Sequence, residues 1–154
     1  MSSTGPETAP SHLILELFSA FVWFDEGLQA RLRAAGWPEV TRPQSMLMCC
    51  LALGLHRPSD IARRVGVSRQ AIHTTIGQLI DKGVLELADD PADRRVKTVE
   101  LTPQGEAMKR DAQAAMTVMV AALTRRIGAR RVAALREALL ADWGDPPPPD
   151  AGAA

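Results

Sequence analysis

The sequence predicts a mainly α-helical fold that includes one short two-stranded hairpin. Apolar residues recur at helical spacing over most of the chain, and only the runs 84–87 and 96–101 have the composition and alternation of strands. The 154 residues are 46% hydrophobic and 23% charged, which suits a single globular domain. We therefore expect one domain over residues 11–143, between a disordered N-terminus (1–10) and a disordered Pro-rich tail (144–154).

The N-terminal third predicts two helices. The first is capped by Ser11 and ends at Gly36, and the second begins after Thr41 and stops at Gly54. Because residues 46–55 are almost continuously apolar, we expect the second helix to be buried on most sides. The apolar positions of the first helix that follow the helical repeat are Ile14, Leu17, Phe18, Phe21, Leu28 and Leu32.

The middle of the chain predicts two helices joined by a tight turn. The first covers residues 58–65, Gly66 supplies the backbone angles of the turn, and Ser68 caps a second helix that ends at Lys82. Gly83 follows in the position that favours glycine after a helix. This arrangement is typical of a helix-turn-helix unit. The core stripe of its second helix consists of Ile72, Ile76, Leu79 and Ile80.

A β-hairpin and two further helices complete the prediction. The strand-like runs 84–87 and 96–101 flank a charged, turn-rich tip at residues 88–95. Thr102 caps a long helix that extends to Gly128, and a last helix follows. The apolar stripe of the long helix is Met108, Ala112, Met116, Met119, Leu123 and Ile127, and that of the last helix is Val132, Leu135, Leu139 and Trp143.

The first turns of the helix that starts after Ser68 carry polar side chains suited to reading DNA. In a helix-turn-helix unit these turns project from the surface and can enter the major groove. Arginine can bind guanine, and glutamine can bind adenine, through two hydrogen bonds each. For His73, simple solvation at the surface stays open as an alternative. The predicted recognition-helix contacts are Ser68, Arg69, Gln70, His73 and Thr74.

The hairpin tip predicts a basic wing beside the recognition helix. Arg94 and Arg95 would reach phosphates or the minor groove, and Lys97 follows in the second strand. We expect Asp93 to hold the guanidinium of Arg95 by a charge-assisted hydrogen bond. A merely solvated hairpin tip is the alternative. Further phosphate contacts are expected from Arg57, Arg63 and Arg64.

Four segments of this region together resemble the multiple-antibiotic-resistance regulator (MarR) family. They are Val65-Gly66-Val67-Ser68, Leu79-Ile80-Asp81-Lys82-Gly83-Val84-Leu85, Asp90-Pro91-Ala92-Asp93-Arg94-Arg95 and Val99-Glu100-Leu101-Thr102-Pro103-Gln104-Gly105. The resemblance implies a winged helix-turn-helix whose DNA-binding lobe covers residues 55–102. It implies a two-fold dimer formed by the helices in residues 11–54 and 103–143. It also implies an effector or redox site between the dimer region and the lobe.

On this resemblance we expect a transcription regulator, a repressor, that binds a near-palindromic double-stranded DNA operator as a homodimer. Two-fold pairing would set the two recognition helices about one DNA turn apart. A small apolar or aromatic effector would release the protein from DNA. Two alternatives stay open: a winged-helix protein-interaction module that does not bind DNA, and a regulator that senses redox state through cysteine.

The charge distribution leaves DNA binding open. The chain carries 18 Lys and Arg against 18 Asp and Glu, so its formal net charge is zero. Residues 57–97 hold eight basic and six acidic side chains, a balance of only +2. Affinity for DNA must therefore come from the placement of particular arginines, since the bulk charge supplies little attraction for phosphate.

The N-terminal helices contain candidates for an effector pocket and for redox chemistry. Arg42 and His12 are candidate anchors for a ligand carboxylate, although aromatic and Met side chains at helical spacing are typically plain core. Cys49 and Cys50 are adjacent in an apolar run, where a free thiol is typically a buried structural residue rather than a redox sensor. The pocket candidates are His12, Trp23, Trp37, Arg42 and Met46.

Several classes of protein are not supported by the sequence. No Gly-rich phosphate loop, no carboxylate pair beside a nucleophile and no spaced Cys and His set are present, so we expect no enzyme activity, cofactor or metal. The apolar runs are interrupted well before the roughly 20 residues that a membrane span needs. Residues 1–10 lack the basic flank and apolar run of a signal peptide, and we expect a cytoplasmic protein.

Overall fold

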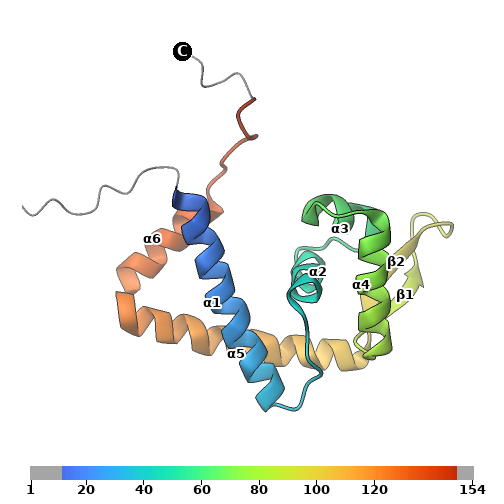
Figure 1. Cartoon of the computed structure of the whole chain (residues 1–154), viewed down its shortest axis with the longest axis horizontal. Helices are drawn as coiled ribbons and strands as arrows, with labels where there is room; N and C mark the ends of the chain where they lie inside the picture. The colour runs from blue at the N-terminus through green and yellow to red at the C-terminus, as the bar shows by residue number, and fades with distance from the viewer. Residues whose placement is uncertain (1–11, 149–154) are drawn as a thin grey trace, which may run out of the picture. The chain divides into compact units, whose positions relative to one another are not determined.

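The computed structural model describes residues 12–148, and its contacts divide the chain into two compact units, residues 1–117 and 118–154. The fold is mainly helical with one antiparallel hairpin, as the sequence predicts (Figure 1). Its elements are α1 (Leu13–Ala34), α2 (Arg42–Ala52), α3 (Pro58–Val65), α4 (Arg69–Asp81), β1 (Leu85–Asp89), β2 (Lys97–Leu101), α5 (Pro103–Ile127) and α6 (Ala129–Leu140). The boundary between the units falls within α5.

The core of the first unit is formed mainly by α2, α3, α4 and the hairpin, and Leu32 of α1 and Met108 of α5 complete it. Figure 1 shows α3 and α4 next to each other, with β1 and β2 beside α4. Each fully buried Leu, Ile or Val side chain stabilises the fold by about 1.5–3 kcal/mol relative to its exposed state. The apolar side chains below 2% exposure are Leu47, Ile61, Leu79, Leu85, Val84 and Val99. This shared core fixes the helix-turn-helix unit against the hairpin.

The turn between α3 and α4 has the local geometry that the sequence predicts. Gly66 ends α3 with a φ of 76°, a left-handed conformation that costs glycine little. The Ser68 hydroxyl accepts a hydrogen bond from the Ala71 N–H at 3.1 Å and so caps α4. Gly83 follows α4 with a φ of 73°, again as predicted. The ends of both helices are therefore determined locally.

The hairpin pairs β1 with β2 from Leu85 opposite Leu101 to Asp89 opposite Lys97. Its strands are shifted from the predicted runs 84–87 and 96–101, because Val84 closes the α4 turn by donating to the Leu79 carbonyl. The loop before α3 adds a further backbone contact, from the Val99 N–H to the His56 carbonyl at 2.9 Å. This contact joins the wing to the start of α3.

The junction between the hairpin and α5 is closely packed around Gly105. The Thr102 hydroxyl donates to the Gly83 carbonyl at 2.6 Å and accepts from the Gly105 N–H at 3.0 Å. A Cβ at position 105 would lie 2.1 Å from the Val84 carbonyl oxygen, a distance that no side chain can tolerate. The segment Leu101-Thr102-Pro103-Gln104-Gly105 thus locks α5 onto the base of the wing.

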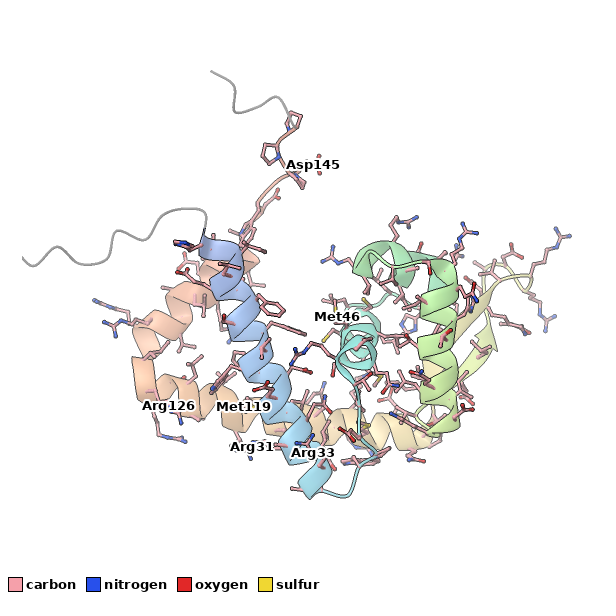
Figure 2. The ribbon with its side chains drawn as sticks, in the orientation of Figure 1. Arg31, Arg33, Met46, Met119, Arg126 and Asp145 are labelled. Atoms are coloured by element: carbon pink, nitrogen blue, oxygen red, sulfur yellow. The ribbon has the colours of Figure 1, made fainter. Side chains whose placement is uncertain are left out.

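Three predictions about the helices need correction or fall outside the structure. The α2 helix is buried on fewer sides than residues 46–55 suggest, since Met46 is 37% exposed and Leu53, just beyond its end, is 69% exposed (Figure 2). Trp143 lies beyond the end of α6 and is exposed, so it does not extend that helix's apolar stripe. Ser11, the predicted first cap, lies outside the described residues, as do 1–10 and 149–154 of the predicted disordered ends.

Each unit leaves a set of large apolar side chains exposed. Contiguous exposed apolar side chains are uncommon on monomeric proteins and typically mark an interaction surface. In the first unit they lie on the N-terminal half of α1, at Leu13, Ile14, Leu15 and Phe18. In the second unit they are Leu135, Leu139, Leu140 and Trp143. Among the helices that the structure describes, none has the length and hydropathy needed to cross a membrane.

Candidate nucleic-acid interface

The N-terminal turns of α4 present a group of free polar side chains. The predicted contacts Ser68, Arg69, Gln70, His73 and Thr74 are all exposed and lie within two turns of one another. Within residues 12–148, the side chains of Arg69, Gln70 and His73 form no hydrogen bond or ion pair. The Thr74 hydroxyl donates to the Gln70 carbonyl at 3.0 Å, which leaves its lone pairs available. This end of α4 can therefore make hydrogen bonds to a partner.

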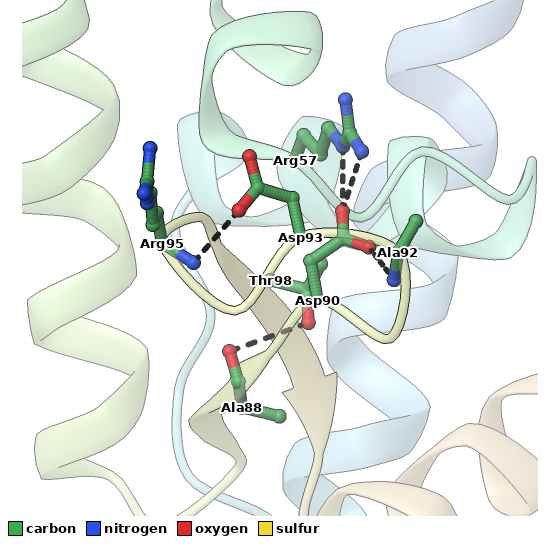
Figure 3. Close-up of polar contacts among 7 residues, drawn as sticks. All are labelled: Arg57, Ala88, Asp90, Ala92, Asp93, Arg95 and Thr98. Carbon is green, nitrogen blue, oxygen red and sulfur yellow. Dashed lines mark hydrogen bonds and ion pairs between the residues drawn. The ribbon is translucent and has the colours of Figure 1, made fainter.

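Asp90 organises the tip of the wing (Figure 3). Its Oδ2 accepts from Nε and Nη2 of Arg57, each at 2.7 Å, and its Oδ1 accepts from the Ala92 N–H at 2.8 Å. Its own N–H donates to the Val96 carbonyl at 2.9 Å. The Ala92 N–H, and after it the Arg57 guanidinium, hold the pKa of the Asp90 carboxyl below its ordinary value. Asp90 therefore stays ionised and ties the wing to the start of α3.

Asp93 does not bind the guanidinium of Arg95, which corrects the prediction from the sequence. Its Oδ1 accepts from the backbone N–H of Arg95 at 3.0 Å (Figure 3). Asp93 and Arg95 are two positions apart, and this spacing favours a turn closed by the carboxylate over a side-chain pair. The guanidinium groups of Arg94 and Arg95 are exposed and form no ion pair with any carboxylate in the described part of the chain. Asp93 thus shapes the turn and leaves both arginines free.

The remaining predicted basic contacts differ in their availability. Arg57 is held by Asp90, Arg63 pairs with Asp60 at 2.6 Å, and Lys97 pairs with Asp89 on the opposite strand. Arg64 is exposed and has no ion pair among the described residues. In the part of the chain that the structure describes, Arg64, Arg69, Arg94 and Arg95 are therefore positive charges without an ion pair near the helix-turn-helix unit. Arg57 instead holds the wing in position through Asp90.

A cavity of about 590 Å³ lies in the first unit. Its apolar lining comes mostly from α1, α2 and the first half of α5. Its polar lining includes Lys109, which pairs with Glu106 at 3.5 Å, and His56, whose Nδ1 lies 3.3 Å from Oε1 of Glu100. Because Lys109 already faces a carboxylate and Glu100 adds a further one, the described lining of the cavity offers no free cation to an anionic ligand. The principal apolar lining residues are Leu28, Leu32, Met48, Leu51, Met108 and Met116.

None of the five pocket candidates from the sequence lines this cavity. Trp37 donates from Nε1 to Asp111 at 2.7 Å, and Arg42 pairs with Asp25 at 3.1 Å. Trp23 packs edge-on against Phe24, with ring centroids 4.8 Å apart. His12 and Met46 are exposed. In the sequence, Met108 and Met116 belong to the apolar stripe of the long helix, and the helical repeat marks such a face without telling whether a cavity faces it.

The two cysteines lie in different surroundings. Cys50 is buried, but Cys49 is exposed and lines the cavity, so burial of both thiols was a wrong prediction. Although the Cys49 residue is exposed, the side chains around its thiol partly desolvate it, and this desolvation, followed by the neighbouring Cys50 and Asp25, raises the pKa of the Cys49 thiol. Burial also raises the pKa of the Cys50 thiol. Both groups are therefore mostly protonated near neutral pH, which slows oxidation and alkylation. Within the described residues, no group of three His, Cys, Asp or Glu side chains is arranged to hold a metal ion.

Comparison with known proteins identifies the helix-turn-helix and wing. The sequence profile of the MarR family matches residues 40–96, and no curated protein matches the chain. The PcaV transcriptional regulator from Streptomyces coelicolor, solved with its natural ligand, is 22% identical, with a TM-score of 0.59 over 90% of this chain and 94% of that one. MarR from E. coli, in its apo form, is 23% identical and has a TM-score of 0.64, and the match covers 82% of this chain and 93% of that one. YusO from Bacillus subtilis is 24% identical and has a TM-score of 0.55, and the match covers 87% of this chain and 95% of that one. These likenesses establish a shared winged-helix fold.

Proposed function

We propose that this chain, a member of the MarR family, is a transcription regulator that binds double-stranded DNA in a sequence-specific manner. The observation that carries the proposal is a set of side chains without a partner among residues 12–148: Arg69, Gln70 and His73 at the exposed start of α4, and Arg94 and Arg95 on the wing beside it. Polar side chains at this end of a recognition helix are those that reach base edges in the major groove.

The two groups of side chains would have different roles at the DNA. Arg69 can bind the O6 and N7 atoms of guanine, and Gln70 can bind the N6 and N7 atoms of adenine. Arg94 and Arg95 at the wing would meet phosphates or the minor groove, and Arg64 the adjacent backbone. We therefore assign sequence preference to α4 and most of the salt-dependent affinity to the wing and Arg64.

The active form in this proposal is a homodimer on a near-palindromic operator. Support comes from the exposed apolar residues of α1 and of the second unit. Contact with a second copy would remove their apolar surface from water, which favours association. A two-fold dimer presents two α4 helices, so its site repeats after about one DNA turn. Bound across a promoter, such a dimer would act as a repressor.

The cavity of about 590 Å³ supports a role for a small-molecule effector. Its lining is mostly apolar, Lys109 already faces Glu106, and Glu100 adds a further carboxylate, so a neutral apolar or aromatic compound fits it better than a carboxylate. The effector would release the operator by binding more tightly to a conformation that does not fit DNA.

A salt titration tests the DNA-binding proposal. Purified protein is titrated with a random-sequence duplex and with pools of promoter fragments, and its mass is measured in the same buffer. We expect a dimer whose affinity falls steeply with salt and a subset of fragments bound about 1000-fold or more above random sequence. A protein that binds no duplex at low salt would instead be a winged-helix protein-interaction module, which the acidic residues at the base of the wing favour.

A further inference from the structure

The first turn of α2 is attached to α1 on one side and to α4 on the other by side-chain hydrogen bonds. Figure 1 shows α2 between these two helices. Gln44 and Ser45 are neighbours in this turn, with exposures of 2% and 7%, and consecutive helical residues point about 100° apart. Gln44 faces α4, whereas Ser45 faces α1 and lines the cavity. This one turn therefore contacts both the cavity and the recognition helix.

Among residues 12–148, Gln44 makes the side-chain hydrogen bonds that run from α2 to the C-terminal end of α4. Its Nε2 donates to Oε1 of Gln78 at 2.9 Å, and its Oε1 accepts from Nζ of Lys82 at 2.9 Å and from the Thr41 N–H at 3.0 Å. Lys82 also donates to the Glu39 carbonyl. Because the amide is almost completely buried, its bonds cannot be replaced by water. The C-terminal end of α4 is thus held at a defined point on α2.

The other side of the same turn is bound to α1. The Ser45 hydroxyl accepts from Nε2 of Gln29 at 2.8 Å, and Arg42 donates from Nε to Asp25 at 3.1 Å. Gln29 and Asp25 are themselves buried on α1. A molecule that enters the cavity meets Ser45 directly, so it competes with or adds to the bond that holds this turn.

We propose that Gln44 is a positioning residue for the recognition helix and that the first turn of α2 couples occupancy of the cavity to the orientation of α4. This inference rests on the proposed function. The α4 helix has 13 residues and is about 20 Å long, so a tilt of about 6° at Lys82 moves its DNA-reading end by about 2 Å. That displacement is larger than a direct hydrogen bond to a base tolerates.

Two substitutions at Gln44 separate positioning from mere stabilisation of the fold. Gln44→Met keeps a side chain of similar size and shape but removes all three hydrogen bonds of the Gln44 amide. Gln44→Glu keeps both acceptor bonds and gains an opposite charge for Lys82, while the amide of Gln78 can turn to donate to the carboxylate. The control is Gln104→Met, which removes an exposed amide at the start of α5.

The first measurement is the ratio of operator affinity to random-duplex affinity, taken with the free energy of unfolding in urea. We expect Gln44→Met to lower the ratio at least about tenfold, because base contacts are lost while phosphate contacts persist. Gln44→Glu and Gln104→Met should keep the ratio within about twofold of the parent. An unchanged ratio in Gln44→Met, or an equal fall in both affinities, would overturn the positioning role. If Gln44→Met does not fold, Gln78→Met removes the same bond from an exposed residue and should lower the ratio too.

The second measurement fills the cavity covalently through Cys49, with N-ethylmaleimide as the probe. The thiolate sulfur adds to the maleimide double bond, a carbon–sulfur bond forms, and a proton is taken up at the adjacent carbon. The matched control is Cys49→Ser treated with the same reagent, which reports any reaction at Cys50. We expect alkylation to change the operator affinity of the parent at least about fivefold and that of Gln44→Met less than about twofold.

The second measurement separates failure of the coupling through α2 from failure of the proposed function. An alkylated parent with unchanged operator affinity would overturn the coupling through α2, and so would an equal response in Gln44→Met. If the unmodified parent binds no duplex at all, the proposed function itself fails, which is visible before any variant is made.

Discussion

Arg57 and Asp90 form a two-point ion pair that joins the residue before α3 to the tip of the wing, with Nε and Nη2 of Arg57 each 2.7 Å from the same carboxylate oxygen. The side chain of Asp90 is 8% exposed and that of Arg57 is 45% exposed, so the carboxylate is enclosed and the guanidinium closes it off from solvent. Thirty-three positions separate the two residues in sequence. The pair therefore sets where Arg94 and Arg95 stand relative to α4.

Breaking this pair should loosen the wing. We expect Arg57→Met to weaken DNA binding several-fold and to raise amide hydrogen exchange in residues 89–97, while the α4 amides keep their protection. Arg64→Met is the control, since it removes a positive charge two turns away that no carboxylate of the described chain holds. Equal losses of affinity in both variants, without a change in exchange at the wing, would assign Arg57 to phosphate contact instead.

The lowered pKa of Asp90 predicts an acid-dependent stability. The folded-state pKa lies below the ordinary value of 3.8, so the ionised carboxylate stabilises the fold above that value, and the contribution is lost as the pH falls through the folded-state pKa. We expect the urea midpoints of the parent and of Asp90→Asn to differ at about pH 6 and to converge as the pH approaches about 2. Parallel curves over this range would show that the ionised form is not the stabilising one.

Arg95→Ala tests the role of the wing in affinity. Because a phosphate or minor-groove contact carries little base information, we expect weaker binding to the operator and to random duplex alike, together with a smaller dependence of log affinity on log salt. Arg33→Ala removes an exposed arginine from the last turn of α1 and is the control (Figure 2). If Arg95→Ala bound DNA with the affinity of the parent, the proposed contact between Arg95 and DNA would be ruled out.

Arg69→Ala and Gln70→Ala test base reading by α4. Each is expected to cost about 1–3 kcal/mol in operator binding and to relax the preference at one base position in each half-site. The affinity for random duplex should change far less in Gln70→Ala than in Arg69→Ala, because Gln70→Ala removes no charge. The measurement is a competition among operators with every single base substitution. An unaltered preference profile in both variants would show that α4 does not read the bases.

Gly105→Ala tests the close packing between α5 and the wing. Its Cβ would meet the Val84 carbonyl oxygen at 2.1 Å, so the backbone must shift, and we expect a loss of about 1–3 kcal/mol in the free energy of unfolding. Gly77→Ala in the interior of α4 is a matched control, because its Cβ would enter open space. That variant should gain about 0.5–1 kcal/mol. Urea unfolding measures both, and a neutral Gly105→Ala would contradict the packing.

The segments that the sequence predicted best are those whose geometry depends on neighbouring residues. The positions predicted from the sequence are confirmed for the α3 helix, the Gly66 turn, the Ser68 cap and the start of α5 at Thr102. Caps, left-handed glycines and Thr-Pro helix starts act over three or four residues, so their signals are complete in a short stretch of sequence. The first strand begins later than predicted because the Val84 N–H bonds to the Leu79 carbonyl in the turn that ends α4. At Val84 the signal for the end of a helix and the signal for a strand compete.

Only the tertiary structure decided which polar groups are free and which are held. Arg57 looks like Arg64 in sequence, yet one is bound by Asp90 and the other is exposed without an ion pair in the described chain. The cavity and the junction at Gln44 likewise combine residues from three helices. The amino-acid sequence by itself determined the helix-turn-helix, the wing and their chemistry through local backbone preferences. The contacts that join separate segments of the chain, from Gln29 with Ser45 to Trp37 with Asp111, link residues 16 to 74 positions apart, which no local pattern encodes.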